Sequence, residues 1–88
     1  MNAPRYPREG SQRRIILDCL IHAEGAWVGL DHLMRIAHAG AAHSTVDGLR
    51  KLGWHIVNRM RQGKRDGQRV TFSEYRIPAE SLPSPKDD

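Results

Sequence analysis

The sequence predicts a small α+β fold, mostly helical, in which three helices are followed by a β-hairpin. Apolar residues recur three and four residues apart over residues 11–52, which is the spacing of a helix face. Beyond Gly53 they alternate with polar residues, which is the spacing of a strand. An Asp-Gly pair, typical of hairpin turns, lies between two such alternating segments. With 88 residues the chain is long enough for one small domain.

The first helix is expected at residues 11–23. Ser11 is a good N-cap, because its hydroxyl can accept a hydrogen bond from a backbone N–H of the first turn. The helix face is formed by apolar residues at spacings of three and four: Ile16, Leu17, Leu20 and Ile21. Gly25 follows as a stop signal, and Trp27 with Val28 forms a short extended segment after it.

Two further helices are expected before Gly53. The second begins near Leu30 or Asp31, where an acidic residue favours the first turn, and the stretch HAG at 38–40 ends it. Its apolar positions are Leu30, Leu33, Met34 and Ile36 or Ala37. The third helix spans about 41–52, and Gly53 ends it. Its inward residues are Ala42, Val46 and Leu49.

Two strands are expected at 54–61 and 69–77, because both segments are rich in β-branched and aromatic residues. The sequence QGKRDGQ at 62–68 reads as the loop between them. Three helices followed by a hairpin with a basic tip form a winged-helix layout, and the short second connection gives a helix-turn-helix. The aromatic residues are expected in the core between helices and hairpin: Trp27, Trp54, Phe72 and Tyr75.

The two ends of the chain have the composition of segments without a packed core. Residues 1–10 contain Pro4, Pro7 and Gly10 without apolar periodicity, and they read as a flexible basic arm. Residues 78–88 contain three prolines among polar residues and are expected to be disordered. The winged-helix domain is therefore expected at 11–77.

Positive charge is gathered in two places. The total is +4, but residues 1–14 carry +3, residues 15–49 carry −3, residues 50–76 carry +6 and residues 77–88 carry −2. This separation indicates a polyanionic partner, most often nucleic acid. The alternative is a solvated basic face that only keeps the protein in solution.

Several classes of protein are excluded by simple features. No 18 consecutive residues are apolar, so no membrane span is expected. The opening MNAPRYPREG has no apolar stretch behind its charges and does not resemble a secretory signal. A single cysteine, Cys19, excludes an internal disulfide framework and makes the cytoplasm the expected compartment.

At this point three stretches resemble a known family: RRIILDCLIHAEGAWVGLDHL, STVDGLRKLGWHIV and EYRI. They resemble the winged helix-turn-helix proteins of bacteriophages and prophages, and the layout is similar to that of the biotin-ligase repressor's N-terminal domain. In that family LRKLGWHI joins the third helix to the first strand of the wing. The resemblance implies a small transcriptional regulator or recombination accessory factor that binds DNA in a bacterial cell, at the nucleoid. Gly48 departs from the pattern, because it lies in the middle of the recognition helix.

The third helix is expected to enter the major groove of double-stranded DNA. Its candidate DNA-binding residues are His43, Ser44, Thr45, Asp47, Arg50 and Lys51. Arg50 is suited to a guanine, but near the helix C-terminus it also suits phosphate or the helix dipole. Asp47 either accepts from a cytosine amino group or forms an ion pair with Arg50 or Lys51.

The hairpin carries the densest positive charge. Its candidate DNA-binding residues are Arg59, Arg61, Lys64, Arg65 and Arg69, which repel one another unless an anion lies beside them. The tip is expected along a phosphate backbone or in a minor groove. Basic residues of the arm are expected to add phosphate or minor-groove contacts: Arg5, Arg8, Arg13 and Arg14.

Other readings of the sequence are weaker. Cys19 and the five histidines lack the paired spacing of a zinc site, so no metal and no other cofactor is expected. No nucleophile elbow, phosphate loop or carboxylate pair is visible, so the chain is not expected to be an enzyme. The rival class is a protein-docking winged helix that uses the net acidic surface of residues 15–49. The sequence does not decide whether the protein forms a homodimer or whether its nucleic-acid partner is RNA.

Overall fold

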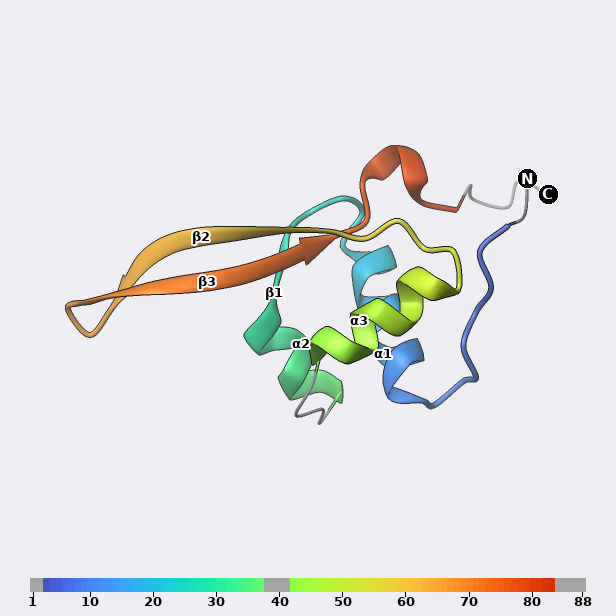
Figure 1. Ribbon diagram of the computed structural model, residues 1–88, viewed down its shortest axis with the longest axis horizontal. Coiled ribbons are helices and arrows are strands. Elements are labelled where there is room, and N and C mark those ends of the chain that lie inside the picture. The colour runs from blue at the N-terminus through green and yellow to red at the C-terminus, as the bar shows by residue number, and fades with distance from the viewer. Residues whose placement is uncertain (1–2, 38–41, 84–88) are drawn as a thin grey trace.

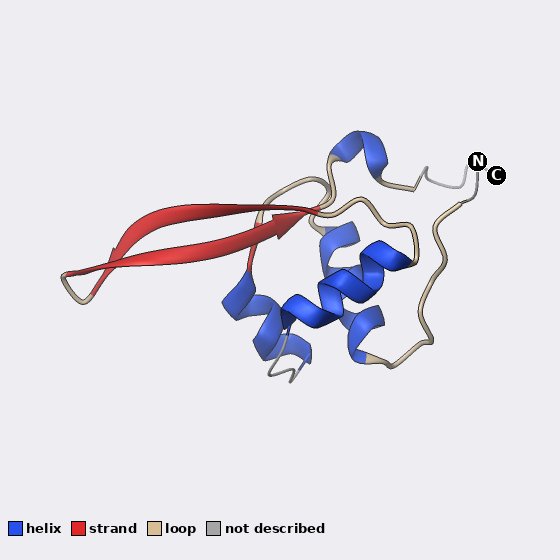
Figure 2. Ribbon diagram, viewed as in Figure 1, coloured by secondary structure: helices blue, strands red, loops and turns tan. Residues whose placement is uncertain are grey.

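The computed structural model describes residues 3–37 and 42–83, which form a small α+β domain. The helices are α1 (Gln12–His22), α2 (Leu30–Ala37) and α3 (Ala42–Lys51), with a short 3₁₀ helix at Ala79–Ser81. The strands are β1 (Val28–Gly29), β2 (Val57–Arg65) and β3 (Gln68–Arg76). The helices pack against one end of the β2–β3 hairpin, whose far end extends beyond them (Figure 1; helices blue and strands red in Figure 2).

The three expected helices are confirmed, and the start of α1, the end of α1, the start of α2 and the end of α3 agree with the prediction to within a residue or two. The turn predicted at 38–40 lies outside the described residues. Ser11 caps α1 as predicted, since its hydroxyl accepts a hydrogen bond from the Arg14 N–H at 3.2 Å. At the other end the chain leaves the helix through Gly25, whose φ of 92° is a conformation that glycine adopts without strain. No helix in the described ranges is long and apolar enough to cross a membrane.

The sheet is antiparallel with the strand order β1-β3-β2. In the hairpin Val57 lies opposite Arg76 and Arg65 lies opposite Gln68, so only Asp66 and Gly67 form the turn. Both turn residues have positive φ, 54° and 78°, as a two-residue type I′ turn requires. The predicted loop at 62–68 is therefore wrong. An Asp-Gly pair closes the hairpin alone, so residues 62–65 continue β2.

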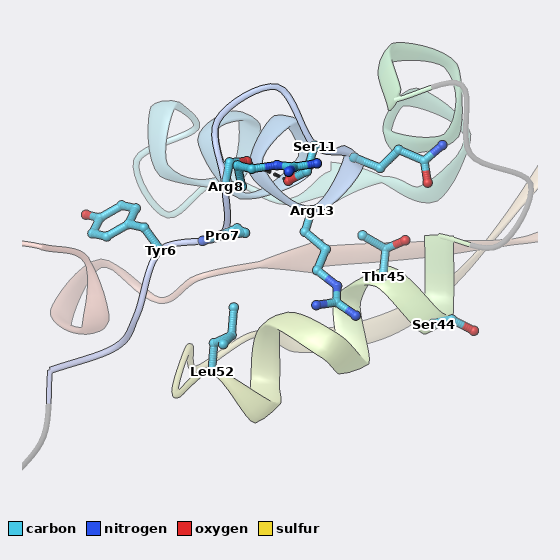
Figure 3. Close-up of a pocket in the computed structure, with 9 residues that line it drawn as sticks. Tyr6, Pro7, Arg8, Ser11, Arg13, Ser44, Thr45 and Leu52 are labelled. Atoms are coloured by element: carbon cyan, nitrogen blue, oxygen red, sulfur yellow. Dashed lines mark hydrogen bonds between the residues drawn. The ribbon is translucent and has the colours of Figure 1, made fainter.

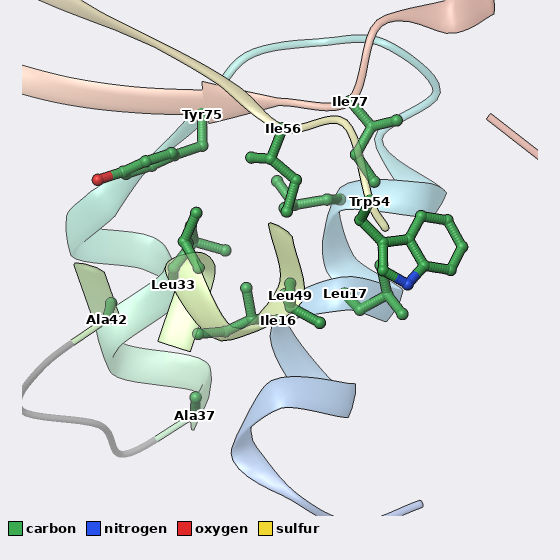
Figure 4. Close-up of a cluster of buried hydrophobic side chains, with 12 residues drawn as sticks. Ile16, Leu17, Leu33, Ala37, Ala42, Leu49, Trp54, Ile56, Tyr75 and Ile77 are labelled. Carbon is green, nitrogen blue, oxygen red and sulfur yellow. The ribbon is translucent and has the colours of Figure 1, made fainter. Parts of the chain in front are cut away.

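The core lies between the helices and the face of the sheet turned toward them (Figure 4). Its side chains are at most 4% exposed: Ile16, Leu17, Leu20, Leu33, Ala37, Ala42, Val46, Leu49, Trp54, Ile56, Tyr75 and Ile77. The core positions predicted for Trp54 and Tyr75 are confirmed, whereas Trp27 and Phe72 are only half-buried. Cys19 packs against the core, and burial raises the pKa of its thiol.

The N-terminal arm makes contacts that the sequence does not predict. The Arg5 N–H donates to the Leu52 carbonyl at 2.9 Å, and the Trp54 indole N–H donates to the Arg5 carbonyl at 2.8 Å. The Tyr6 ring meets the Trp54 ring edge-on, with centroids 5.1 Å apart. A buried indole N–H needs an acceptor, and the arm supplies it. Residues 1–2 lie outside the described part of the chain.

The segment after β3 also differs from the disorder predicted for residues 78–88. Pro78 is buried, the 3₁₀ helix Ala79–Ser81 follows it, and Leu82 packs against the core. The apolar Leu82 anchors this segment, although prolines dominate its composition. The prediction for residues 84–88 lies outside the described residues.

Candidate nucleic-acid interface

Helix α3 presents a polar ridge on the side opposite the core. Ala42, Val46 and Leu49 are buried, as predicted, whereas His43, Ser44, Asp47, Arg50 and Lys51 are exposed. A helix repeats every 3.6 residues, so Ser44, Asp47 and Lys51 share the outward side of α3. Thr45 and Gly48 are half-buried on one flank of this ridge.

The other flank of α3 is joined to the sheet. The Tyr75 hydroxyl of β3 and Nδ1 of His43 are 2.6 Å apart, and their rings meet edge-on. This contact turns one ring nitrogen of His43 toward the core and leaves the exposed side of the ring for a partner. His43 therefore links α3 to the hairpin in addition to bordering the candidate surface.

Arg50 is held by the protein itself. Its Nε and Nη2 donate to the Ile56 carbonyl at 3.0 and 2.9 Å, and its Nη1 donates to Asp47 at 2.9 Å. Of the two roles considered for Asp47, the ion pair with Arg50 is present in the structure. The guanidinium fastens the end of α3 to the segment that leads into β2. Of the roles considered for Arg50, which were a guanine contact, a phosphate contact and an interaction with the helix dipole, this contact argues against the guanine contact.

We expect Arg50→Ala to lower the free energy of unfolding by about 1 kcal/mol, because the Ile56 carbonyl loses its charged hydrogen-bond donor. The loss is limited because the Arg50 side chain is partly exposed to water. Lys51→Ala is the matched control, since Lys51 is exposed and forms no ion pair within the described part of the chain. Urea unfolding of both variants checks this. Equal stability of the two variants would contradict the structural role of Arg50.

The hairpin has two faces of different character. Side chains alternate between the faces of a strand, so Arg59, Arg61 and Arg65 lie on one face and Lys64 on the other. We call the face of Arg59, Arg61, Arg65, Phe72, Glu74 and Arg76 the outer face. The face of Met60, Lys64, Arg69 and Tyr75 is the inner face, because Tyr75 points into the core from it.

The arginines of the outer face have acidic and aromatic partners. Arg59 and Arg61 reach Glu74 at 2.7 and 3.3 Å, and Arg65 reaches Asp31 of α2 at 3.3 Å. The guanidiniums of Arg59 and Arg76 lie 4.4 and 5.0 Å from the Trp27 ring centroid. Those of Arg61 and Arg65 lie 5.2 and 5.5 Å from the Phe72 ring centroid. The repulsion expected among these charges is therefore relieved within the chain.

Glu74 is the centre of the outer face. Its side chain is only 13% exposed, and the hydrogen bond from Arg59, followed by that from Arg61, lowers the pKa of its carboxyl. Glu74 is not identified from the sequence as a functional or structural residue, although it is one of only two acidic residues in the 50–76 segment. The antiparallel register that brings Arg59 opposite it would have identified it.

The lowered pKa of Glu74 predicts a pH dependence of stability. Its ion pairs stabilise the fold fully above its ordinary pKa of 4.5, and this contribution is lost as pH falls through the lowered value. We expect the Tm of the wild type to fall more steeply below pH 4.5 than that of Glu74→Gln. Thermal unfolding from pH 3 to pH 6 measures this. Parallel profiles would contradict the role given to Glu74.

The inner face of the hairpin carries two basic residues without an acidic partner. Lys64 and Arg69 lie directly opposite each other and are exposed. Among residues 3–37 and 42–83, no side chain forms an ion pair with either of them. Met60, 66% exposed, lies on the same face nearer the helices. Of the five predicted hairpin residues, Lys64 and Arg69 are thus the two that need an external anion most.

No family model, curated protein or solved structure matches this chain. In the described part of the chain, no group of three or more His, Cys, Asp or Glu side chains is placed to hold a metal ion. His38 lies outside the described residues.

Proposed function

We propose that this protein is a winged-helix protein that binds double-stranded DNA, with α3 in the major groove and the β2–β3 hairpin along the phosphate backbone. An α-helix with its side chains is about 10–12 Å across, and the major groove is about 12 Å wide. By the resemblance of its sequence, its role is that of a small phage or prophage regulator or recombination accessory factor.

The observation that carries this proposal is a shared side of the molecule. The inner hairpin face, with Lys64 and Arg69, is the face from which Tyr75 contacts His43 of α3. The exposed ridge of α3 and the two basic residues without acidic partners therefore lie toward the same side of the molecule, with Lys64 and Arg69 near the far end of the hairpin (Figure 1). A duplex that receives α3 in its groove brings its phosphates toward the hairpin.

The ridge of α3 divides into positioning and reading residues. Lys51, at the C-terminal end of the helix, suits a phosphate, whereas Ser44 near the start suits a base edge or a phosphate. Asp47 holds Arg50 and has a side chain that is 64% exposed, so its second oxygen stays accessible to a cytosine amino group.

The test is a titration of a fluorescein-labelled 20-base-pair duplex with the protein, followed by fluorescence anisotropy at several salt concentrations. Contacts from Lys51, Lys64 and Arg69 alone predict a log–log salt slope of about −3. Unlabelled single-stranded DNA, duplex RNA and an acidic protein serve as competitors. No duplex binding at low salt, or a slope near zero, would overturn the proposal in favour of a protein-docking domain.

A further inference from the structure

A groove runs along the flank of α3 that faces away from the hairpin (Figure 3). His43 and Arg50, seven residues apart, mark the hairpin flank, and Thr45 and Leu52, also seven apart, mark the other. The groove has a volume of about 560 Å³ and lies between α3, the start of α1 and the arm. Ser44 from the α3 ridge is part of its lining.

The groove carries two positive charges. Arg8 and Arg13 line it, both are exposed, and neither has an ion pair within residues 3–37 and 42–83. No acidic side chain is among the described residues that line it. Arg14 contrasts with them, since it pairs with Asp18 at 3.1 Å and donates to the Pro7 carbonyl at 3.2 Å. Arg14 thus fixes the arm, and Arg8 and Arg13 face the groove.

Gly48 explains how Arg13 lies so close to α3. A Cβ at position 48 would lie 2.8 Å from Nε and 3.0 Å from Cζ of Arg13. The guanidinium therefore rests against the helix backbone, where any other residue would push it away. A glycine in a helix interior is less favourable than alanine, so Gly48 lowers the intrinsic stability of α3. In return, the missing Cβ leaves room for the Arg13 side chain.

We propose that this groove binds a phosphodiester group of the DNA strand on the side of α3 opposite the hairpin. This inference rests on the proposed function. The planar guanidinium of Arg13 matches the paired oxygens of a phosphate and Arg8 supplies a second charge, while Ser44 connects the groove lining to the α3 ridge. Basic residues then lie to both sides of α3, Arg8 with Arg13 in the groove and Lys64 with Arg69 near the far end of the hairpin.

The first test removes the charges of the groove. Two additional phosphate contacts raise the expected salt slope of the wild type to about −4 to −5, and Arg8→Ala with Arg13→Ala should return it to about −3. Arg35→Ala is the matched control for Arg13→Ala, because Arg35 is exposed on α2 and lies outside the groove lining. We expect Arg13→Ala to weaken duplex binding roughly tenfold and Arg35→Ala to leave it near the wild-type value.

The second test leaves every charge in place. Gly48→Ala adds one methyl group, which displaces the flexible guanidinium of Arg13 and favours the helix. We expect its Tm to equal or exceed that of the wild type while its duplex affinity falls about as far as in Arg13→Ala. Wild-type affinity in either variant, with the wild type itself binding the duplex, would overturn this inference and leave the proposed function intact. Failure of the wild type to bind would overturn the proposed function itself.

Discussion

Replacement of Lys64 and Arg69 together by alanine is expected to weaken binding to every duplex by roughly 100-fold at low salt and to reduce the salt slope by about two units. The two side chains face each other on the inner hairpin face without an acidic partner among the described residues. A phosphate contact carries no base preference, so a selected site and a scrambled duplex should lose affinity equally.

The matched control is Arg61→Ala with Arg65→Ala, which removes the same charge from the outer face of the same hairpin. Arg61 pairs with Glu74 and Arg65 pairs with Asp31, so neither is as available to a phosphate as the inner pair, and their removal should weaken binding much less. Glu74 keeps its ion pair with Arg59 in this variant. Circular dichroism serves to check that both double variants fold. Equal losses from the two pairs would mean that only the net charge of the hairpin matters.

Trp54→Ala is expected to destabilise the protein by about 3–5 kcal/mol, a large part of the total stability of a small domain. The Trp54 side chain is 4% exposed, packs in the core and holds the arm through its hydrogen bond to the Arg5 carbonyl. Urea unfolding measures the loss. Trp27→Ala is the comparison, because Trp27 is half-buried against Arg59 of the outer face. The stability lost in this variant should be distinctly smaller.

Trp54→Phe separates the two roles of Trp54. Phenylalanine retains most of the apolar packing and removes the indole N–H that the Arg5 carbonyl accepts. We expect faster tryptic cleavage after Arg5 and Arg8 in this variant, at a much smaller loss of stability than in Trp54→Ala. Unchanged cleavage would show that the arm does not depend on the indole hydrogen bond.

The helices were predictable because their signals are local. The Ser11 cap, the apolar spacing of α1 and the glycines that end α1 and α3 all act within a few residues. The inward face of α3 followed from the same spacing, so the exposed positions of Ser44, Asp47 and Lys51 were predictable as well.

Features that depend on distant partners were not predictable in the same way. The separation of Lys64 from Arg61 and Arg65 requires the hairpin register, which the Asp66–Gly67 turn sets and which the expected wider loop obscured. Arg65 meets Asp31 across 34 positions, and Trp54 meets Arg5 across 49. Pairings of this kind follow no periodic pattern in the sequence. The charge density of the hairpin therefore did not reveal that Arg59, Arg61 and Arg65 have acidic partners within the chain.

The proposed DNA-binding surface is one side of the molecule, formed by the α3 ridge and the inner hairpin face. Chemical-shift mapping of the ¹⁵N-labelled protein during addition of a duplex tests it most directly. We expect the largest perturbations at Ser44, Lys51, Lys64 and Arg69, and little change at Trp27 and Arg76 on the outer side. Perturbations centred on Trp27 and Arg76, or no perturbation at any duplex concentration, would contradict it.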